Sequence, residues 1–280
     1  MIKINGVQYM TDFEAKKVIL EVGKRMYAKG FVASNDGNIS VKVGPNAVWV
    51  TPTGVSKGYM TSDMLVKLNL DGKVIYGRNK PSSEIKMHLR VYMENPDVLA
   101  VTHAHPPVAT SFAIAGLQLD RAILPEAVVN LGSVPIAPYA TPGTQEVPDS
   151  IAPYCRSHNA VLLANHGALT WGRDVFEAYY RLESLEYYAT VMMYTGNIIG
   201  KANELSCNQV SQLVQIREKL GINSGGVPAC AVTETNINGF SSPLIHTPPK
   251  DSAVQEMDKE EVIRSIVEKV TKNILQTYKR

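Results

Sequence analysis

The chain has 280 residues, of which 45% are hydrophobic and 19% charged, a composition typical of a globular protein with a sizeable core. A net charge of +2, without any block of Lys or Arg, gives no electrostatic basis for nucleic-acid binding. No apolar run reaches the length of a membrane span, and the opening MIKINGVQYM lacks the layout of a secretory signal, so we expect neither membrane insertion nor secretion.

The cysteines support the same expectation of a cytoplasmic protein. Cys155, Cys207 and Cys230 lie far apart, and their number is odd. This usage is typical of proteins from a reducing compartment, and the spacing matches no metal site.

Helical and strand patterns alternate densely over residues 1–220. In chain order, they predict a helix at 11–29, strands at 47–54 and 73–77, a helix at 82–95, strands at 98–105, 133–140 and 160–169, and helices at 174–194 and 208–220. Such a mixture predicts an α/β or α+β sandwich built around a sheet.

The composition changes near residue 221. Residues 221–256 are rich in Gly, Ser, Thr, Asn and Pro without any periodicity, which predicts a flexible linker. Residues 257–280 then predict an amphipathic helix, opened by a capping box formed by Asp258 and Glu261. Its apolar face comprises Val262, Ile263, Ile266, Val267, Val270 and Ile274. The long tether favours a docking peptide over a segment that folds back on the body.

The stretch VTHAHPP, residues 101–107, places two histidines at the end of a predicted strand. Because side chains alternate along a strand, His103 and His105 project to the same side. They could bind one metal ion, or they could be two core histidines. His166 lies at the end of another apolar run, before Gly167, and three imidazoles at strand ends fit a catalytic zinc or other divalent-metal site.

Residues suited to binding an anion precede this motif in the sequence. Ser82 and Ser83 precede Glu84 where the helix at 82–95 begins, and free backbone N–H groups there suit a phosphate. The turns SNDGNIS (34–40) and TPTGVS (51–56) offer further donors. Each segment alone is also explained as an ordinary helix cap or turn. His88, one helical turn after Glu84, is assigned a structural role.

Six short motifs in this order resemble the class II aldolase family, in particular its L-fuculose-1-phosphate aldolase branch. The resemblance covers roughly residues 10–217. Its motifs are Gly37-Asn38-Ile39-Ser40, Thr51-Pro52-Thr53-Gly54, Pro81-Ser82-Ser83-Glu84, His103-Ala104-His105, Ala137-Pro138-Tyr139-Ala140-Thr141 and Asn165-His166-Gly167. Each is weak alone, but six in order at family-like separations are specific.

The resemblance implies a fold, an assembly and a set of roles. The fold would be an α/β/α sandwich around a mainly antiparallel sheet, assembled as a fourfold homotetramer with sites between subunits. A zinc-type ion would be bound by His103, His105 and His166, with Glu84 as a further ligand or as the base. The substrate phosphate would be bound by Asn38, Thr53, Gly54, Ser82 and Ser83. The expected reaction is cleavage of L-fuculose 1-phosphate, or L-rhamnulose 1-phosphate, to dihydroxyacetone phosphate and L-lactaldehyde.

Two features depart from the compact members of that family. The family carries a tyrosine for the aldehyde-side proton in the segment that corresponds to ILPEAVV (123–129), where this chain has Pro125 and Glu126. Glu126, or a tyrosine elsewhere, would have to replace it. The other departure is the tail, which resembles the encapsulation peptides of bacterial microcompartment enzymes. Such compartments confine lactaldehyde, so the resemblance implies cargo bound to shell or other cargo proteins.

Other activities of the same fold stay open. A ribulose-phosphate 4-epimerase typically has Asp in place of Glu84, which argues against that branch, and a methylthioribulose-phosphate dehydratase is a further alternative. A non-catalytic, adducin-like interaction module lacks the histidine set that this chain carries.

Overall fold

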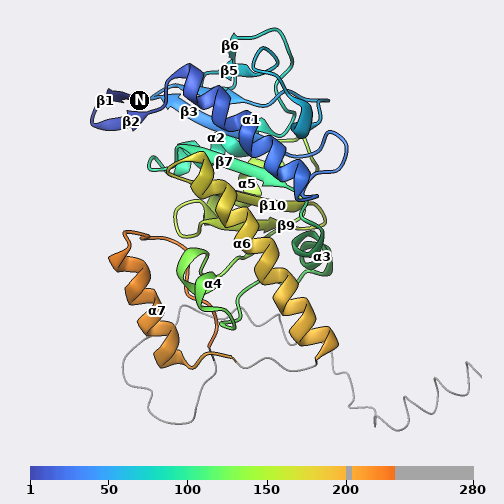
Figure 1. Cartoon of the computed structure of the whole chain (residues 1–280), viewed down its shortest axis with the longest axis vertical. Coiled ribbons are helices and arrows are strands. Elements are labelled where there is room, and N and C mark those ends of the chain that lie inside the picture. Colours follow the sequence, from blue (N-terminus) through green and yellow to red (C-terminus); the bar gives the residue numbers. More distant parts are fainter. Residues whose placement is uncertain (200–203, 231–280) are drawn as a thin grey trace, which may run out of the picture. The chain divides into compact units, whose positions relative to one another are not determined.

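The computed structural model describes residues 1–199 and 204–230 of the chain (Figure 1). The predicted helix at 257–280, with its six apolar face residues, and the expected linker beyond residue 230 lie outside the described residues. Within that part, no helix combines the length and the apolar character needed to span a membrane.

The strands form one large sheet and one small hairpin. They are β1 (Ile2–Ile4), β2 (Val7–Tyr9), β3 (Asn38–Gly44), β4 (Ala47–Val50), β5 (Val66–Leu68), β6 (Val74–Tyr76), β7 (Ala100–Ala104), β8 (Ile136–Ala137), β9 (Ala160–Leu163) and β10 (Gly167–Gly172). The hairpin is β1–β2, and the eight-stranded sheet has the order β6-β5-β4-β3-β7-β10-β9-β8. Among the paired strands of the described residues, only β8 and β9 run in parallel, so the expected mainly antiparallel sheet is confirmed.

Helices cover both faces of this sheet. They are α1 (Asp12–Ala28), α2 (Ile85–Glu94), α3 (Pro107–Ala115), α4 (Pro125–Asn130), α5 (Glu146–Ile151), α6 (Val175–Met193) and α7 (Cys207–Lys219), with short helical turns η1 (Lys57–Tyr59), η2 (Ala152–Tyr154) and η3 (Tyr194–Ile198). Helices α1, α3 and α6 pack on one face, and α1 and α6 cross the front of the sheet in Figure 1. Helix α2 and α5 form the core on the other face. The α/β/α sandwich is confirmed.

Local sequence signals account for the limits of the long helices. Thr11 caps α1 in a reciprocal arrangement with Glu14, and Asp174 caps α6 by accepting from the backbone N–H groups of Phe176 and Glu177. Such a cap contributes about 1 kcal/mol to helix stability. These two helices therefore begin where the sequence predicts.

Two strand predictions needed correction. The run 160–169 is not one strand but the hairpin β9–β10, because Asn165 adopts a left-handed backbone conformation (φ 57°) and reverses the chain. The run 133–140 contributes only the short strand β8. Strand β3, which the sequence led us to interpret as part of a turn, is fully buried and hydrogen-bonded to β4 and β7.

The segment 221–230, expected to begin a flexible linker, is hydrogen-bonded to the body of the protein. The N–H groups of Gly225 and Gly226 donate to the Ser157 carbonyl, and the guanidinium of the buried Arg217 donates to the Gly226 carbonyl at 2.7 Å. The compact unit that begins at Met1 includes this segment. The packed body thus continues past the boundary expected at residue 220.

The sequence did not predict the disulfide between Cys207 and Cys230, whose Cα atoms lie 5.0 Å apart. The disulfide depends on local pairing around Ala122, whose N–H donates to the Ala229 carbonyl and whose carbonyl accepts from Leu205. The two cysteines flank these partners and are brought side by side. Cys155 remains a buried free thiol. The cysteine usage therefore gives no support for a reducing compartment.

Candidate metal centre and active site

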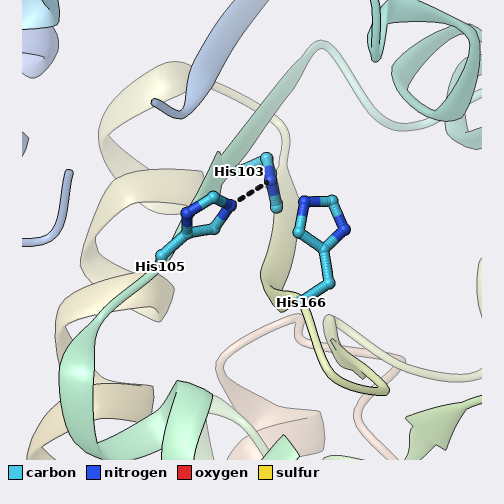
Figure 2. A group of neighbouring side chains, drawn as sticks. All are labelled: His103, His105 and His166. Carbon is cyan, nitrogen blue, oxygen red and sulfur yellow. Dashed lines mark hydrogen bonds between the residues drawn. The ribbon is translucent and has the colours of Figure 1, made fainter. Parts of the chain in front are cut away.

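The three predicted histidines meet at one end of the central strands. His103 is the penultimate residue of β7, His105 follows that strand, and His166 lies in the turn between β9 and β10. One ring nitrogen from each residue lies within 4.8 Å of the others. Figure 2 shows the three rings facing one another. The antiparallel pairing of β7 with β10 brings these residues together, although the chain separates them by some 60 positions.

Close backbone approach makes this meeting possible. A Cβ atom on Gly167 would lie 2.5 Å from the Ala104 carbonyl oxygen and 2.6 Å from the His105 ring. Any larger residue would therefore push the β9–β10 turn, and His166 with it, away from the other two histidines.

The ring protons of His103 and His105 point away from the centre. Nδ1 of His103 lies 2.9 Å from the carbonyl oxygen of Ala168, which can only accept, so this nitrogen carries the proton. Nδ1 of His105 faces the carboxylate of Asp36 at 3.4 Å. Both rings then present an Nε2 lone pair to the centre, and these two nitrogens are 3.2 Å apart. Two lone pairs at this distance repel unless a cation lies between them, so the donor set fits a divalent metal ion.

Burial keeps these imidazoles in the form that binds metal. Desolvation lowers the pKa of the fully buried His103 well below its usual value, and the nearby Glu84 opposes this only in part. Desolvation also lowers the pKa of His105, assisted by His166. Both rings are therefore neutral at neutral pH, as metal ligation requires.

Glu84 reaches the same centre from the other side of the cavity. Its Oε1 lies 3.0 Å from Nε2 of His166, and its Oε2 lies 3.4 Å from Nε2 of His103. Oε2 also accepts a hydrogen bond from the Asn38 amide at 2.9 Å. Burial raises the pKa of Glu84, but the hydrogen bonds from the His166 ring and the Asn38 amide outweigh it, so the pKa lies below its usual range. The carboxylate is ionised and can act as a ligand or as a base.

The predicted anion-binding residues line a cavity of about 200 Å³ next to this centre. Asn38, Thr53, Ser82 and Ser83 line it together with Glu84, His105 and His166, whereas Gly54 is not part of the lining. Within the described part of the chain, the exposed hydroxyls of Thr53 and Ser83 have no hydrogen-bond partner. They are therefore free to bind an anion.

Backbone hydrogen bonds tie the walls of the cavity together. Ser82 N–H donates to the Thr51 carbonyl at 3.1 Å, and Thr53 N–H donates to the Lys80 carbonyl at 3.0 Å. The Thr51 hydroxyl accepts from Ile39 N–H at 3.2 Å. Asn38 itself pairs with His103 in the β3–β7 ladder. Three separate segments are thus fixed around the metal centre.

Two predicted assignments fall outside this cavity. Glu126 is exposed in the first turn of α4 and does not line the cavity of its own chain. His88 is fully buried, with Nδ1 2.7 Å from the Ser40 hydroxyl, which also contacts the Tyr92 hydroxyl. The structural role assigned to His88 is confirmed.

Three residues that sequence reasoning missed also contribute to the site. Asp36 contacts His105, and the buried ammonium of Lys57 lines the cavity. Glu186, on α6, accepts hydrogen bonds from Val108 and Ala109 N–H at 3.0 and 2.8 Å, which fixes the start of α3 just after His105. Asp36 lies inside one turn that the sequence singled out, and Lys57 directly follows the other. Glu186 gives no local signal, because only the tertiary fold brings it to α3.

Residues 17–193 match the family described as class II aldolase and adducin N-terminal domain. The chain is 33% identical over 181 residues to a 3-oxo-tetronate 4-phosphate decarboxylase of Haemophilus influenzae, covering 63% of this chain and 86% of that protein. It is 30% identical over 179 residues to an L-fuculose phosphate aldolase of Methanococcus maripaludis, covering 64% and 96%. It is 32% identical over 207 residues to a 5-deoxy-D-ribulose 1-phosphate aldolase of Bacillus thuringiensis, covering 74% and 96%.

Solved structures show the same relationship. The crystal structure of YgbL from Klebsiella pneumoniae superposes with a TM-score of 0.69 at 30% identity, covering 73% of this chain and 99% of that one. An L-fuculose 1-phosphate aldolase superposes with a TM-score of 0.69 at 28% identity, covering 75% and 98%. The matched region includes all three histidines, Glu84 and the turns predicted to bind an anion. The chain therefore belongs to the class II aldolase family and is an enzyme of the lyase class.

Proposed function

We propose that this enzyme cleaves a ketose 1-phosphate by a metal-dependent retro-aldol reaction, with L-fuculose 1-phosphate or L-rhamnulose 1-phosphate as substrate and dihydroxyacetone phosphate and L-lactaldehyde as products. The observation that carries the proposal is the placement of an ionised carboxylate and three inward-facing imidazoles beside a cavity lined by unpaired hydroxyls. One end binds a metal, and the other suits a phosphate.

Separate residues would bind the metal ion and the phosphate. His103, His105 and His166 would hold the ion, and zinc fits because its nitrogen ligands in a tetrahedral site, at about 2.0–2.1 Å from the metal, lie about 3.3 Å apart. The two Nε2 atoms, at 3.2 Å, already approach this spacing. When bound, the ion supplies Lewis-acid stabilisation of the charge on an enediolate. Thr53, Ser82, Ser83 and Asn38 would bind the phosphate and so place the carbonyl carbon near Glu84.

Glu84 would move the proton at the reacting carbon. In the condensation direction, its ionised carboxylate removes a proton from C3 of dihydroxyacetone phosphate, and the electron pair passes to the carbonyl as an enediolate. In cleavage, a base on the aldehyde side takes the proton of the C4 hydroxyl, the C3–C4 bond breaks, and C4 becomes the aldehyde carbon. The electron pair of that bond passes to the enediolate, and Glu84, protonated by exchange with water, delivers a proton to C3. Replacing Glu84→Gln should abolish solvent deuterium exchange into dihydroxyacetone phosphate, a partial reaction that needs no aldehyde.

Decarboxylation of a 3-oxo-tetronate 4-phosphate is the second candidate, because a relative with this activity is among those most similar to the chain. This reaction also leaves a negative charge next to a carbonyl and uses a phosphorylated substrate, so the same residues would serve it. The two candidates differ in the leaving fragment, which is an aldehyde in one case and CO₂ in the other.

Product analysis separates the candidates. The metal-loaded enzyme should be assayed with L-fuculose, L-rhamnulose and 5-deoxy-D-ribulose 1-phosphates and with a 3-oxo-tetronate 4-phosphate. We expect dihydroxyacetone phosphate and an aldehyde from a ketose 1-phosphate. Release of CO₂ from the oxo acid, without aldehyde from any ketose phosphate, would reverse the assignment. Epimerisation or dehydration of a pentose phosphate without cleavage would favour the remaining alternatives.

We also propose a homotetramer with sites between subunits and cargo status in a bacterial microcompartment, both of which rest on the family resemblance and on the tail. In such a tetramer Glu126, which lies outside the cavity of its own chain, would act on the aldehyde side at a neighbouring subunit. Light scattering measures the mass of the assembly and so tests the homotetramer. A Glu126→Gln variant whose kcat/KM equals that of the wild type would exclude Glu126 from the aldehyde side of the reaction.

A further inference from the structure

Lys57 is a buried cation beside the proposed phosphate subsite. It begins the helical turn η1, directly after the turn 51–56, and only 1% of its surface is exposed. Burying an ammonium is costly unless it finds partners, so the acceptors around this side chain show why it is retained. Desolvation lowers the pKa of Lys57 to about 8, while Asp36 and Glu84 favour its charged form.

The acceptors of Lys57 come from two separate loops. Its Nζ donates to the Asn35 carbonyl at 2.8 Å and to the Val55 carbonyl at 2.6 Å. Asn35 belongs to the loop 34–38, and Val55 belongs to the turn 51–56. The ammonium therefore connects two segments whose neighbouring residues Ile39 and Thr51 are also joined, by the Thr51 N–H that donates to the Ile39 carbonyl at 3.1 Å and by the Ile39 N–H that donates to the Thr51 hydroxyl at 3.2 Å.

Both connected segments carry residues of the site. The loop 34–38 contributes Asp36, which contacts His105, and Asn38, which donates to Glu84. The turn 51–56 contributes Thr53, whose hydroxyl is free and lines the cavity. Asn38 and Thr53 are the two proposed phosphate donors of these segments, and Lys57 adds to the β3–β4 contacts that set the spacing between them.

We propose that Lys57 is a positioning residue of the phosphate subsite, which holds the loop 34–38 and the turn 51–56 at the spacing that a phosphate ester requires and places a cation beside that anion. An ammonium has three N–H donors, and two of them bind these carbonyls. This inference rests on the proposed function in one respect, which is that the ligand carries a phosphate.

The test compares two buried lysines. Lys57→Met removes the ammonium at the cavity but keeps the length of the side chain. Lys42→Met is the matched control, because Lys42 is also buried, lies on β3, and does not line the cavity. For each metal-loaded protein, calorimetry measures the Kd of glycerol 3-phosphate, a phosphate ester without a reactive carbonyl, with glycerol as the unphosphorylated control. Steady-state kinetics with the active ketose 1-phosphate give KM and kcat.

We expect Lys57→Met to weaken glycerol 3-phosphate binding and to raise KM by at least about tenfold, since a hydrogen bond to a charged group contributes about 1.5–3 kcal/mol. The kcat should change much less than KM, and Lys42→Met should bind the ester as the wild type does. A folded Lys57→Met protein with wild-type Kd, or a loss no larger than that of Lys42→Met, would overturn the inference.

Two further outcomes are informative. If Lys57→Met does not fold, Lys57→Arg and Lys57→Gln replace it, and the inference then requires the charged variant to bind the ester more tightly than the neutral one. If the wild type itself binds no glycerol 3-phosphate and cleaves no sugar phosphate, the proposed function fails. A wild type that binds the ester as tightly as the Lys57 variants contradicts the positioning role alone.

Discussion

At the scale of single residues, the candidate metal centre depends on residues that contact the outer nitrogen of each histidine and so orient its ring. The carboxylate of Asp36 faces Nδ1 of His105 at 3.4 Å and favours the tautomer that presents Nε2 to the metal. We expect Asp36→Asn to weaken zinc affinity by about 10–100-fold, the range typical of such outer partners. Competition with a fluorescent chelator measures this affinity.

The control for Asp36 is Asp63→Asn. Asp63 contacts the Thr61 hydroxyl in an exposed turn and does not line the cavity. This variant should bind zinc as the wild type does. An Asp36→Asn protein with unchanged zinc affinity would show that the ring of His105 is oriented by its backbone alone.

The buried His88 should lower the free energy of unfolding in acid. Burial lowers the pKa of His88 in the folded protein to about 3, and Glu84 opposes this shift only in part, whereas the unfolded chain has a value of about 6.5. Below pH 6.5 the unfolded state therefore binds a proton that the folded state does not. The free energy of unfolding should fall with decreasing pH, by up to about 1.4 kcal/mol per unit from this group.

Urea titrations at pH 7, 6 and 5 test this effect. The other buried histidines whose pKa is lowered act in the same direction, so the informative quantity is the difference between the wild type and His88→Gln. The variant should show a shallower dependence on pH, by about one proton. Equal slopes for the two proteins would contradict the account of His88.

At this scale the sequence predicted the ligands better than their supports. Strand alternation placed His103 and His105 on one side, the end of a second apolar run suggested His166 as the third ligand, and the resemblance added Glu84. The sequence did not predict the burial of Lys57, because a lysine after a polar turn is ordinarily a solvated side chain. Glu186 accepts a hydrogen bond from Ala109 in α3, which lies 77 positions earlier in the chain, and no local sequence pattern encodes such a contact.

At the scale of elements, the segment 221–230 is the part of the chain that departs most from the sequence prediction. A Cβ atom on Gly132 would lie only 1.4 Å from the Gly225 carbonyl oxygen, so this segment can pack only against a glycine. We expect Gly132→Ala to displace the segment and to reduce the free energy of unfolding by more than backbone strain alone. Chemical denaturation measures this quantity.

Gly143→Ala is the matched control for that substitution. Gly132 and Gly143 share a left-handed backbone, with φ of 74° and 83°, but nothing lies within 4 Å of a Cβ at Gly143. The control should lose only the strain of about 1–2 kcal/mol. Similar losses in the two variants would show that the contact between Gly132 and Gly225 does not hold the segment.

Element types were predictable where a periodic pattern met a capping residue, as in α1 with Thr11 and α6 with Asp174. Strand β3 was missed because its first residues belong to the polar run SNDGNIS, although every residue of the strand is buried. Composition suggested a linker at 221–230, since Gly and Ser are usually flexible. Here Gly225 and Gly226 serve close packing instead.

At the scale of the whole molecule, the place of truncation distinguishes the body from the tail. A chain ending at Cys230 keeps the disulfide and the hydrogen bonds of the segment 221–230, and we expect its turnover and stability to match those of the full chain. A chain ending at Gly221 loses the disulfide and the contact of Arg217 with Gly226, and should unfold more readily.

The same pair of truncations tests the docking proposal for the tail. Removal of residues 231–280 should abolish co-purification with microcompartment shell proteins while leaving aldol cleavage intact. If the chain ending at Cys230 loses turnover or its oligomeric state, the tail belongs to the catalytic assembly and the docking proposal fails.

The central claim is that three imidazoles and Glu84 form a metal-dependent aldolase site, and chelation tests it most directly. The measurement is the rate of dihydroxyacetone phosphate release from L-fuculose 1-phosphate by the purified enzyme, before and after EDTA treatment and after stoichiometric zinc is restored. We predict that EDTA abolishes the release and that zinc recovers it in the wild type but not in His103→Ala. Undiminished release in EDTA, or equal recovery in His103→Ala, would contradict the claim.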